Sequence, residues 1–502
     1  MYLPKKKIVN IRPAVIITAG LIIGILSAYT FMMVNAYFSA VIFCFCIVLS
    51  TVITAYFFLA KRKVYAVTFL ISTIFILIGA TLFLVSNLNF YSSVGNSNFL
   101  GVVSEIFSET KMDSGYNYSM ILKGDFLSNE NASVYISIFS TERIFEGSKI
   151  ALSGYFSLIE PSDFTISTNA FYSVIIEDGS LVVGEIEGVF NMLKHRLLTA
   201  FETSIKDTSG LNYGVITGNT CYAGEEVLSK YQNLGIAHVF AVSGLHVGLF
   251  YFALSKLFKV FFESNKISFA LITVILYLYV GFCGFTASAI RAFIIITVRN
   301  FAKLLGQKSD SSSNIALSAF IVLIVNPSDL LSAGFLLSYS VYSGLVLLTK
   351  PFAVGIGKIL PKRFSNILAP GIVALVVSFP ILIDFFGYAS PFSFLFNLAI
   401  IPCIAFIFPF LLLSSVLLLI FPSGIIFGVV PNLFFTIIEF LLSFINTEAF
   451  MVSGINFYYS SVAYYLFFYL FAKKFNFSKK TYLILHIITL CAFILFFAII
   501  NL

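Results

Sequence analysis

The stretch PFSFLFNLAIIPCIAFIFPFLLLSSVLLLI, residues 391–420, is long enough to cross a bilayer and contains no Asp, Glu, Lys, Arg or His. Similar apolar runs recur along most of the chain. Of its 502 residues, 59% are hydrophobic and 11% are charged, whereas about a quarter of a typical soluble domain is charged. The sequence therefore predicts a polytopic α-helical membrane protein and excludes a disordered chain, a disulfide-stapled secreted domain and a coiled coil.

About thirteen of these runs are expected to span the membrane as helices. The number of spans could differ from thirteen by one or two, because the runs at 234–255 and 313–326 are short or interrupted by glycine and could be re-entrant. The expected spans are 14–33, 37–60, 64–86, 234–255, 268–284, 286–305, 313–326, 329–349, 364–386, 391–420, 423–446, 457–472 and 480–501.

Basic clusters mark alternate ends of these runs. By the positive-inside rule this pattern places the N-terminus in the cytoplasm, the C-terminus outside, and the long segment after the third run outside. No cleavable signal peptide is expected, since the first run is long and lacks a convincing cleavage site. The clusters lie within 5–12, 61–63, 256–266, 299–308, 350–363 and 473–480.

Residues 87–190 differ from the rest in both charge and pattern. They hold 13 Asp or Glu against 4 Lys or Arg, a net charge of −9, so the formal charge of +7 leaves +16 on the remainder. Stretches rich in Val, Ile, Tyr, Phe and Ser alternate with turn residues and predict a small extracytoplasmic all-β domain. A five-stranded OB-type barrel and a short β-sandwich both fit. The expected strands are 99–107, 116–123, 133–140, 149–156 and 171–177.

Residues 188–206 have one apolar helical face and predict an amphipathic helix, either at the membrane surface or packed on the β domain. The chain is thus expected to have four parts. These are three N-terminal transmembrane helices (1–86), the β domain (87–187), the amphipathic helix with a connecting loop (188–233) and a second transmembrane domain (234–502).

Two charged residues stand alone inside apolar runs. Arg291 is the only Asp, Glu, Lys or Arg between Lys266 and Arg299, and Asp384 is the only one between Arg363 and Glu439. A charge costs about 2.5–3.5 kcal/mol at the centre of a span on insertion scales, so each must face protein or water. Both residues are candidates to line a polar path, although a buried ion pair or a side chain reaching for the membrane surface is the simpler alternative.

The segment IAHVFAVSGLHVGLF, residues 236–250, holds two of the four His of the chain. On an unbroken helix His238 and His246 would lie about 12 Å apart, too far to share a metal. A break at Ser243-Gly244 would instead create a helix N-terminus inside the membrane, whose free N–H groups favour an anion. The alternative for each His is an interior residue held by a hydrogen bond.

Sequence signatures of enzymes are missing. The sequence contains no HxHxDH, HExxH, GxSxG or GxxxxGK[ST] motif, and its six Cys show no metal-binding spacing. We therefore expect no catalytic residues, no metal, no cofactor and no ATP-driven motor within the chain.

Four stretches in order, HVFAVSGLHVGLF, GFTASAIRAFIIITV, ALSAFIVLIVNPSDLLSAGFLLSYSVYSGL and FFGYASPFSFLFNLAIIP, resemble the membrane domain of the ComEC family of competence proteins. The resemblance extends over residues from about 211 to about 410. The family also has an extracytoplasmic OB-like domain between early spans and this domain, and residues 87–190 match it by position and strand count, not by sequence.

The resemblance implies a channel that moves single-stranded DNA across the bacterial cytoplasmic (inner) membrane in natural transformation. It implies as partners the DNA strand, membrane lipid, a cytoplasmic ATP-driven motor, an extracytoplasmic DNA receptor and a separate nuclease. Asp384 joins the expected path as a lone intramembrane charge. The other candidate residues, carried over by motif, are His238, Ser243, Gly244, His246, Arg291, Asn326, Pro327, Ser338, Asn397 and Pro402.

Two departures from the family pattern bear on this expectation. Many members carry a C-terminal metallo-β-lactamase-like domain, which this chain does not show. The net negative charge of the β domain disfavours strong electrostatic binding of DNA. Contact with DNA would need a local patch or stacking on aromatic residues, namely Phe126, Tyr135, Phe139, Tyr155 or Phe156.

Two rival functions remain open. A secondary transporter of a small anionic solute would share the broken helix and the buried Arg, but it predicts inverted repeats and leaves the β domain without a role. An intramembrane hydrolase would use His238, Ser243 or His246 together with Asp384, and it requires a base within hydrogen-bond reach of Ser243.

Overall fold

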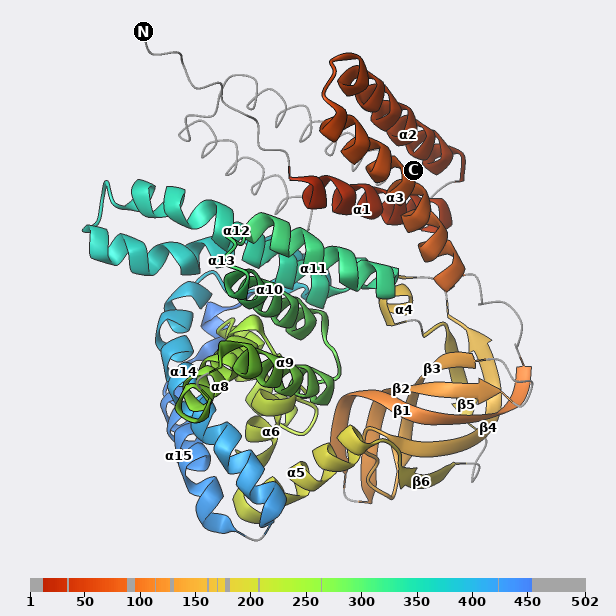
Figure 1. Ribbon diagram of the computed structural model, residues 1–502. Coiled ribbons are helices and arrows are strands. Elements are labelled where there is room, and N and C mark those ends of the chain that lie inside the picture. Colours follow the sequence, from red (N-terminus) through yellow and green to blue (C-terminus); the bar gives the residue numbers. More distant parts are fainter. Residues whose placement is uncertain are drawn as a thin grey trace.

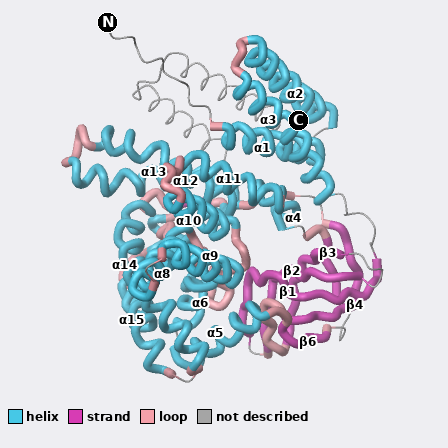
Figure 2. The backbone as a smooth tube through the Cα atoms, viewed as in Figure 1, coloured by secondary structure: helices cyan, strands magenta, loops and turns pink. Residues whose placement is uncertain are grey.

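A computed structural model describes the backbone of residues 12–33, 36–87, 95–112, 114–126, 131–159, 162–168, 170–176, 181–205, 208–262, 264–422 and 424–453. Helices form most of this part of the chain, and a six-stranded β region lies at one side of them (Figures 1 and 2). The expected spans 457–472 and 480–501 fall outside the described residues.

The N-terminal helices α1 (Pro13–Met33), α2 (Ala36–Leu59) and α3 (Lys63–Asn87) coincide with the first three expected spans. Glycine allows α1 and α3 to approach closely, because a Cβ at Gly24 would meet the backbone carbonyl of Ile76 and one at Gly79 would meet that of Leu21. Such small-residue contacts are typical of helices packed within a membrane. This bundle also packs against α11 (Ser311–Val325).

The β region is a sheet closed on itself. Its strands run in the order β1-β2-β3-β5-β4-β6, and β1 pairs with β4 as well as with β2, so the first five named strands form a ring. All pairings are antiparallel except the short one between β3 and β5. The strands are β1 (Gly95–Met112), β2 (Gly115–Phe126), β3 (Asn131–Ser140), β4 (Ser148–Leu158), β5 (Tyr172–Ile176) and β6 (Val182–Ile186), with helix α4 (Asp163–Thr168) before β5.

Alternate residues of the strands fill the interior of this barrel. The rings of Phe99, Phe126 and Phe156 are buried and pack against one another, with centroid separations of 4.9–6.0 Å. Of the aromatic residues considered above for DNA stacking, Phe126 and Phe156 are therefore core residues. The five expected strands are confirmed, and β6 is a sixth that the sequence pattern did not reveal.

Helices α5 (Val189–Ile205), α6 (Ser209–Thr217) and α7 (Glu225–Asn233) connect the barrel to the remaining helices. The apolar face of α5 is buried along its second half, at Leu197, Phe201 and Ile205, where it packs against α6, α14 and α15. The predicted amphipathic helix is thus present, with protein covering that half of its apolar face.

A network of ion pairs, which we name the barrel clamp, fixes α5 to the barrel. Arg143 pairs with Glu109 of β1 (2.9 Å) and with Glu202 of α5 (2.7 Å). Lys194 of α5 pairs with Glu146, which also accepts a hydrogen bond from the Asn219 amide. These contacts join segments that are far apart in sequence.

The other long helices follow the apolar pattern of the sequence. Within the described ranges, six candidates are long and apolar enough to cross a membrane, and four further apolar helices are shorter. The expected spans from 268 to 446 each contain one helix, while the number of true spans stays a prediction. The helices are α8 (Gly244–Phe261), α9 (Asn265–Phe282), α10 (Ala287–Leu304), α11, α12 (Ala333–Ile356), α13 (Lys362–Phe386), α14 (Ser393–Ile420) and α15 (Ile425–Leu442). The short strands β7 (Tyr388–Ala389) and β8 (Val452–Ser453) pair antiparallel with each other.

Candidate anion-binding site around Arg291

The apolar run at 234–255 is broken, as the Ser-Gly pair predicts. A single 3-10 turn, Ala237–Val239, precedes α8, which begins at Gly244 with Ser243 as its N-cap. The Ser243 hydroxyl accepts from Leu245 N–H (3.2 Å), and the Ser243 N–H donates to His246 Nδ1 (3.2 Å). This reciprocal capping box satisfies donors at a helix start that is surrounded by protein.

Arg291 lies against this helix start. It projects from α10, is only 7% exposed, and its guanidinium donates to the backbone carbonyl of Ser338 on α12. The guanidinium carbon lies 5.8 Å from the ring centre of Tyr339 and 5.1 Å from that of Tyr342. A Cβ at Gly244 would lie 3.0 Å from Arg291 Nη2, so glycine lets the guanidinium reach the first turn of α8.

The partners of this buried cation are neutral. Among the described residues no carboxylate forms an ion pair with Arg291. The rings stabilise the positive charge without cancelling it, and the start of α8 adds the positive end of a helix dipole. The arrangement suits a negatively charged group, such as a phosphate, that approaches both the guanidinium and the helix N-terminus.

Several polar atoms at this site have no hydrogen-bond partner in the described part of the chain, and two of them bear on the chemistry of the site. They are His246 Nε2, which belongs to a side chain that is 1% exposed, and Ser338 Oγ. The His246 ring packs edge-on against Phe408 of α14, with centroids 4.9 Å apart. Because Nδ1 accepts the capping N–H, the neutral ring carries its proton on Nε2.

The structure brings together Ser243, Gly244, His246, Arg291 and the Ser338 carbonyl, five of the expected path positions. Of the remaining ones, His238 lies on the 3-10 turn just before this helix start, near enough to His246 for their charges to interact, and the others lie elsewhere in the described helical region. His238 is exposed on the 3-10 turn, Asp384 is exposed near the end of α13, Asn397 lies in the first turns of α14 with a buried Oδ1, and Asn326 ends α11.

Tyr339 and Tyr342 were not predicted from the sequence, although a signal was available. Both follow Ser338 in the stretch LLSYSVYSGL, and Tyr342 is four residues after Ser338, hence on the same helix face. Aromatic residues beside a lone intramembrane Arg are natural partners for it. Since aromatic residues are common throughout this chain, the pattern by itself did not distinguish them.

Asn326 belongs to a separate cluster between the barrel and α12. Its amide donates to Asp329 Oδ1 (2.8 Å) in the 3-10 helix Pro327–Leu331, which lies outside the candidate membrane-spanning helices. Burial raises the pKa of Asp329 to about 6, while the bond from Asn326 and the charge of Lys123 on β2 act in the opposite direction. Helix α4 packs on the same 3-10 helix, so this cluster lies where the barrel meets the membrane helices.

Comparison with known proteins gives one family and a few relatives. The family model described as Competence protein matches residues 215–499, more than half of the chain. ComE operon protein 3 of Bacillus subtilis (strain 168) is 30% identical over 260 residues, which are 51% of this chain and 32% of that relative. An uncharacterized protein of Mycoplasma genitalium is 28% identical over 182 residues, 36% of this chain and 45% of that relative. The aligned segments thus span less than half of the length of these curated relatives, and no solved structure matches.

Proposed function

The chain belongs to the Competence protein family, and from this premise we propose that it is a channel that passes a single DNA strand across the cytoplasmic membrane during competence. The observation that carries the proposal is Arg291, a buried cation with neutral partners that lies at a helix N-terminus inside the matched region. A strand carries one negative charge per nucleotide, so a passage for it needs fixed positive groups away from competing carboxylates.

The proposed channel holds its substrate weakly. One guanidinium and one helix terminus attract each phosphate as it arrives, and the neutral rings of Tyr339 and Tyr342 offer no fixed counter-charge that would trap the strand. Arg291 is buried in this structure, so helices α8, α10 and α12 would have to separate to admit a strand. We therefore interpret the structure as a closed state.

The proposed topology follows from the basic clusters. The N-terminus lies in the cytoplasm and the barrel outside, where it would meet incoming DNA. The ring β1-β2-β3-β5-β4, which closes onto β1, supports an OB-like fold for this barrel. The chain would work with a DNA receptor outside, an ATP-driven motor inside and a separate nuclease, and it would itself catalyse no reaction.

The proposal is tested by uptake of labelled DNA into the cytoplasm of cells that carry Arg291→Ala or His246→Ala at normal protein level. Both variants should take up less DNA, because one loses the charge and the other loses the His246 half of the capping box at the start of α8. Arg299→Ala is the matched control, since Arg299 is an exposed basic residue of the same helix. Undiminished uptake in both test variants would remove these residues from the path.

One observation favours an intramembrane hydrolase as a second candidate. Ser243 Oγ lies 3.1 Å from His246 Nδ1, within reach for a nucleophile and its base. The same nitrogen also accepts the Ser243 N–H, as a structural cap requires. A fluorophosphonate probe separates the two functions: covalent labelling that Ser243→Ala abolishes supports the hydrolase, and no labelling supports the channel.

The solute-transporter alternative predicts saturable uptake of a small anion that depends on Arg291.

A further inference from the structure

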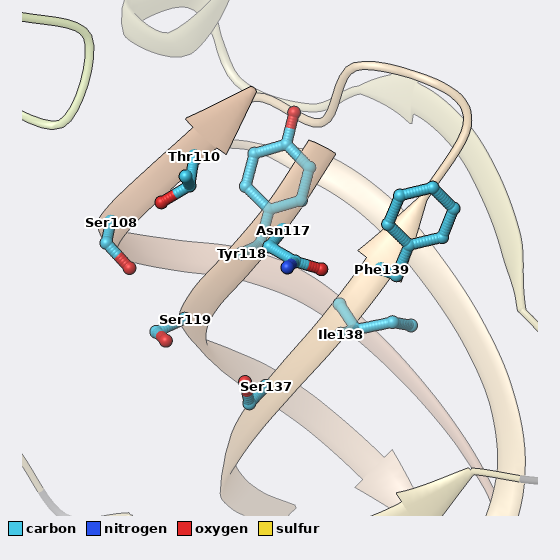
Figure 3. Close-up of a pocket in the computed structure, with 8 residues that line it drawn as sticks. All are labelled: Ser108, Thr110, Asn117, Tyr118, Ser119, Ser137, Ile138 and Phe139. Atoms are coloured by element: carbon cyan, nitrogen blue, oxygen red, sulfur yellow. The ribbon is translucent and has the colours of Figure 1, made fainter. Parts of the chain in front are cut away.

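A polar pocket opens on the outer face of the barrel, away from the site around Arg291. It has a volume of ≈ 290 Å³ and is lined by residues of β1, β2 and β3. Figure 3 shows its side chains, which include Ser108, Thr110, Asn117, Ser119 and Phe139. The volume is close to the lower end of the range of about 300–1,000 Å³ typical of small-ligand sites, so the pocket suits one or two rings of a ligand.

The strand register builds this pocket from two cross-strand rows. In the first row Ser108 pairs with Ser119, which pairs with Ser137, so three hydroxyls lie side by side. In the second row Thr110, Asn117 and Phe139 are neighbours in the same way. Each row crosses three strands whose opposite faces fill the barrel core, and this packing fixes the spacing of the side chains.

An aromatic ring lies at the edge of these hydroxyls. Phe139 is 43% exposed, although a phenyl ring in a small barrel is ordinarily buried. An exposed ring beside several hydroxyl and amide groups can stack on the apolar face of a sugar ring while the polar groups bond to its hydroxyls. The Asn117 amide donates one N–H to Met112 Sδ (3.0 Å), so its other amide atoms are left for a ligand.

The electrostatics of the pocket favour a neutral ligand over a phosphodiester. None of the lining residues is Lys or Arg. At the margin Thr110 donates to the carboxylate of Glu225 (3.5 Å), and residues 87–190 together carry a charge of −9. Binding of a nucleic-acid backbone depends on basic groups that neutralise its phosphates, and this surface would repel it.

We propose that this pocket binds a neutral saccharide, and that the barrel thereby contacts glycan chains outside the membrane. OB-type barrels bind oligosaccharides as well as oligonucleotides on the face of their second and third strands, where this pocket lies. The OB-like fold and the extracytoplasmic position of the barrel rest on the function proposed above, but binding of the saccharide by the barrel is tested independently of the channel.

The test uses the full chain in detergent and the tetrasaccharide of N-acetylglucosamine as the probe, with binding followed by saturation-transfer NMR and titration calorimetry. We expect saturable binding of the sugar, weakened about fivefold to tenfold by Phe139→Ala. Ser119→Val should also weaken binding, because it removes the central hydroxyl of the serine row. Tyr155→Ala is the matched control, since Tyr155 is a 48% exposed ring of β4 outside the pocket.

Three results would overturn the proposal. The first is no saturable binding of the tetrasaccharide at millimolar concentration. The second is binding that Phe139→Ala and Ser119→Val leave unchanged. The third is a thymidine oligonucleotide that binds with a Phe139-dependent affinity while the sugar does not, which would assign the pocket to single-stranded DNA.

Discussion

Two arginines of this chain, the partly buried Arg143 and the buried Arg291, have opposite surroundings. Arg143, in the barrel clamp, lies between the carboxylates of Glu109 and Glu202, while the partners of Arg291 in the described part of the chain are a backbone carbonyl and two tyrosine rings. Burial lowers the pKa of the Arg143 guanidinium, but the bonds to Glu109 and Glu202 outweigh it and the net shift is upward. The positive charge of Arg143 is therefore paired with carboxylates and joins two segments, whereas the charge of Arg291 has no carboxylate partner among the described residues.

The largest expected effect comes from Arg291→Gln. Removing the charge should reduce DNA uptake by about 10- to 1,000-fold, the range over which a charged cleft concentrates an oppositely charged ligand. Thermal stability should stay close to that of the parent, because no carboxylate in the described structure depends on Arg291. Uptake of labelled DNA and a melting curve of the purified protein check both statements, and Arg291→Lys should retain part of the uptake.

Gly244→Val should give the next largest loss of uptake. A Cβ at this position would lie 3.0 Å from Arg291 Nη2, so the larger side chain would press on the guanidinium and move it away from the start of α8. We expect a drop of roughly threefold to tenfold, smaller than for loss of the charge itself. Gly248→Val on the same helix is the control, because a Cβ at Gly248 meets nothing within 4 Å. Equal uptake by the two variants would contradict the role assigned to the contact.

Arg143→Ala should act on stability instead of on the proposed path. It leaves the mostly buried carboxylate of Glu109 without its main partner, which costs about 3 kcal/mol when one member of a buried pair is removed. The measurement is denaturant unfolding followed by barrel fluorescence or circular dichroism. Lys149→Ala breaks the exposed pair with Glu187 and should change stability by less than about 1 kcal/mol. A stable Arg143→Ala variant would show that the clamp does not hold the barrel.

Asp329→Asn should stabilise the protein in a pH-dependent way. The folded pKa of about 6 lies above the ordinary value of 3.8 because burial disfavours the carboxylate. The parent therefore loses stability as pH rises from about 4 to 6, by up to about 3 kcal/mol, and the neutral variant does not. Melting temperatures at pH 4 and pH 7.5 check this: the advantage of the variant should be present at pH 7.5 and absent at pH 4.

Local patterns made much of the fold predictable. Apolar runs located the long helices, because a run of about 20 apolar residues forms a helix long enough to cross a bilayer. The Ser243-Gly244 pair located the start of α8, because the side chain of a capping serine bonds the backbone and competes with continuation of the helix. The five strands followed from alternation in the acidic segment. The short β6 was missed, since five residues give too little alternation to detect.

Long-range contacts could not be predicted in the same way. Arg143 pairs with carboxylates 34 and 59 positions away, and Arg291 donates to a carbonyl 47 positions away. The local sequence therefore does not show which of the two arginines has carboxylate partners. The sequence predicted Ser338 as a path residue, and in the structure its backbone carbonyl and the nearby Tyr342 ring contact Arg291. Asn326 stays a predicted path residue, and its bond to Asp329 near the barrel was not predicted.

Photo-crosslinking to a DNA strand in transit tests the central claim most directly. The photoreactive residue p-benzoylphenylalanine replaces Tyr342, whose ring lies beside Arg291, or Leu347, which is 61% exposed on the same helix. Cells take up radiolabelled DNA and are irradiated during uptake. We predict a DNA adduct at position 342 that is lost when Arg291 is also changed to Gln, and none at position 347. Equal adducts at both positions, or none at position 342 while uptake proceeds, would contradict a DNA path past Arg291.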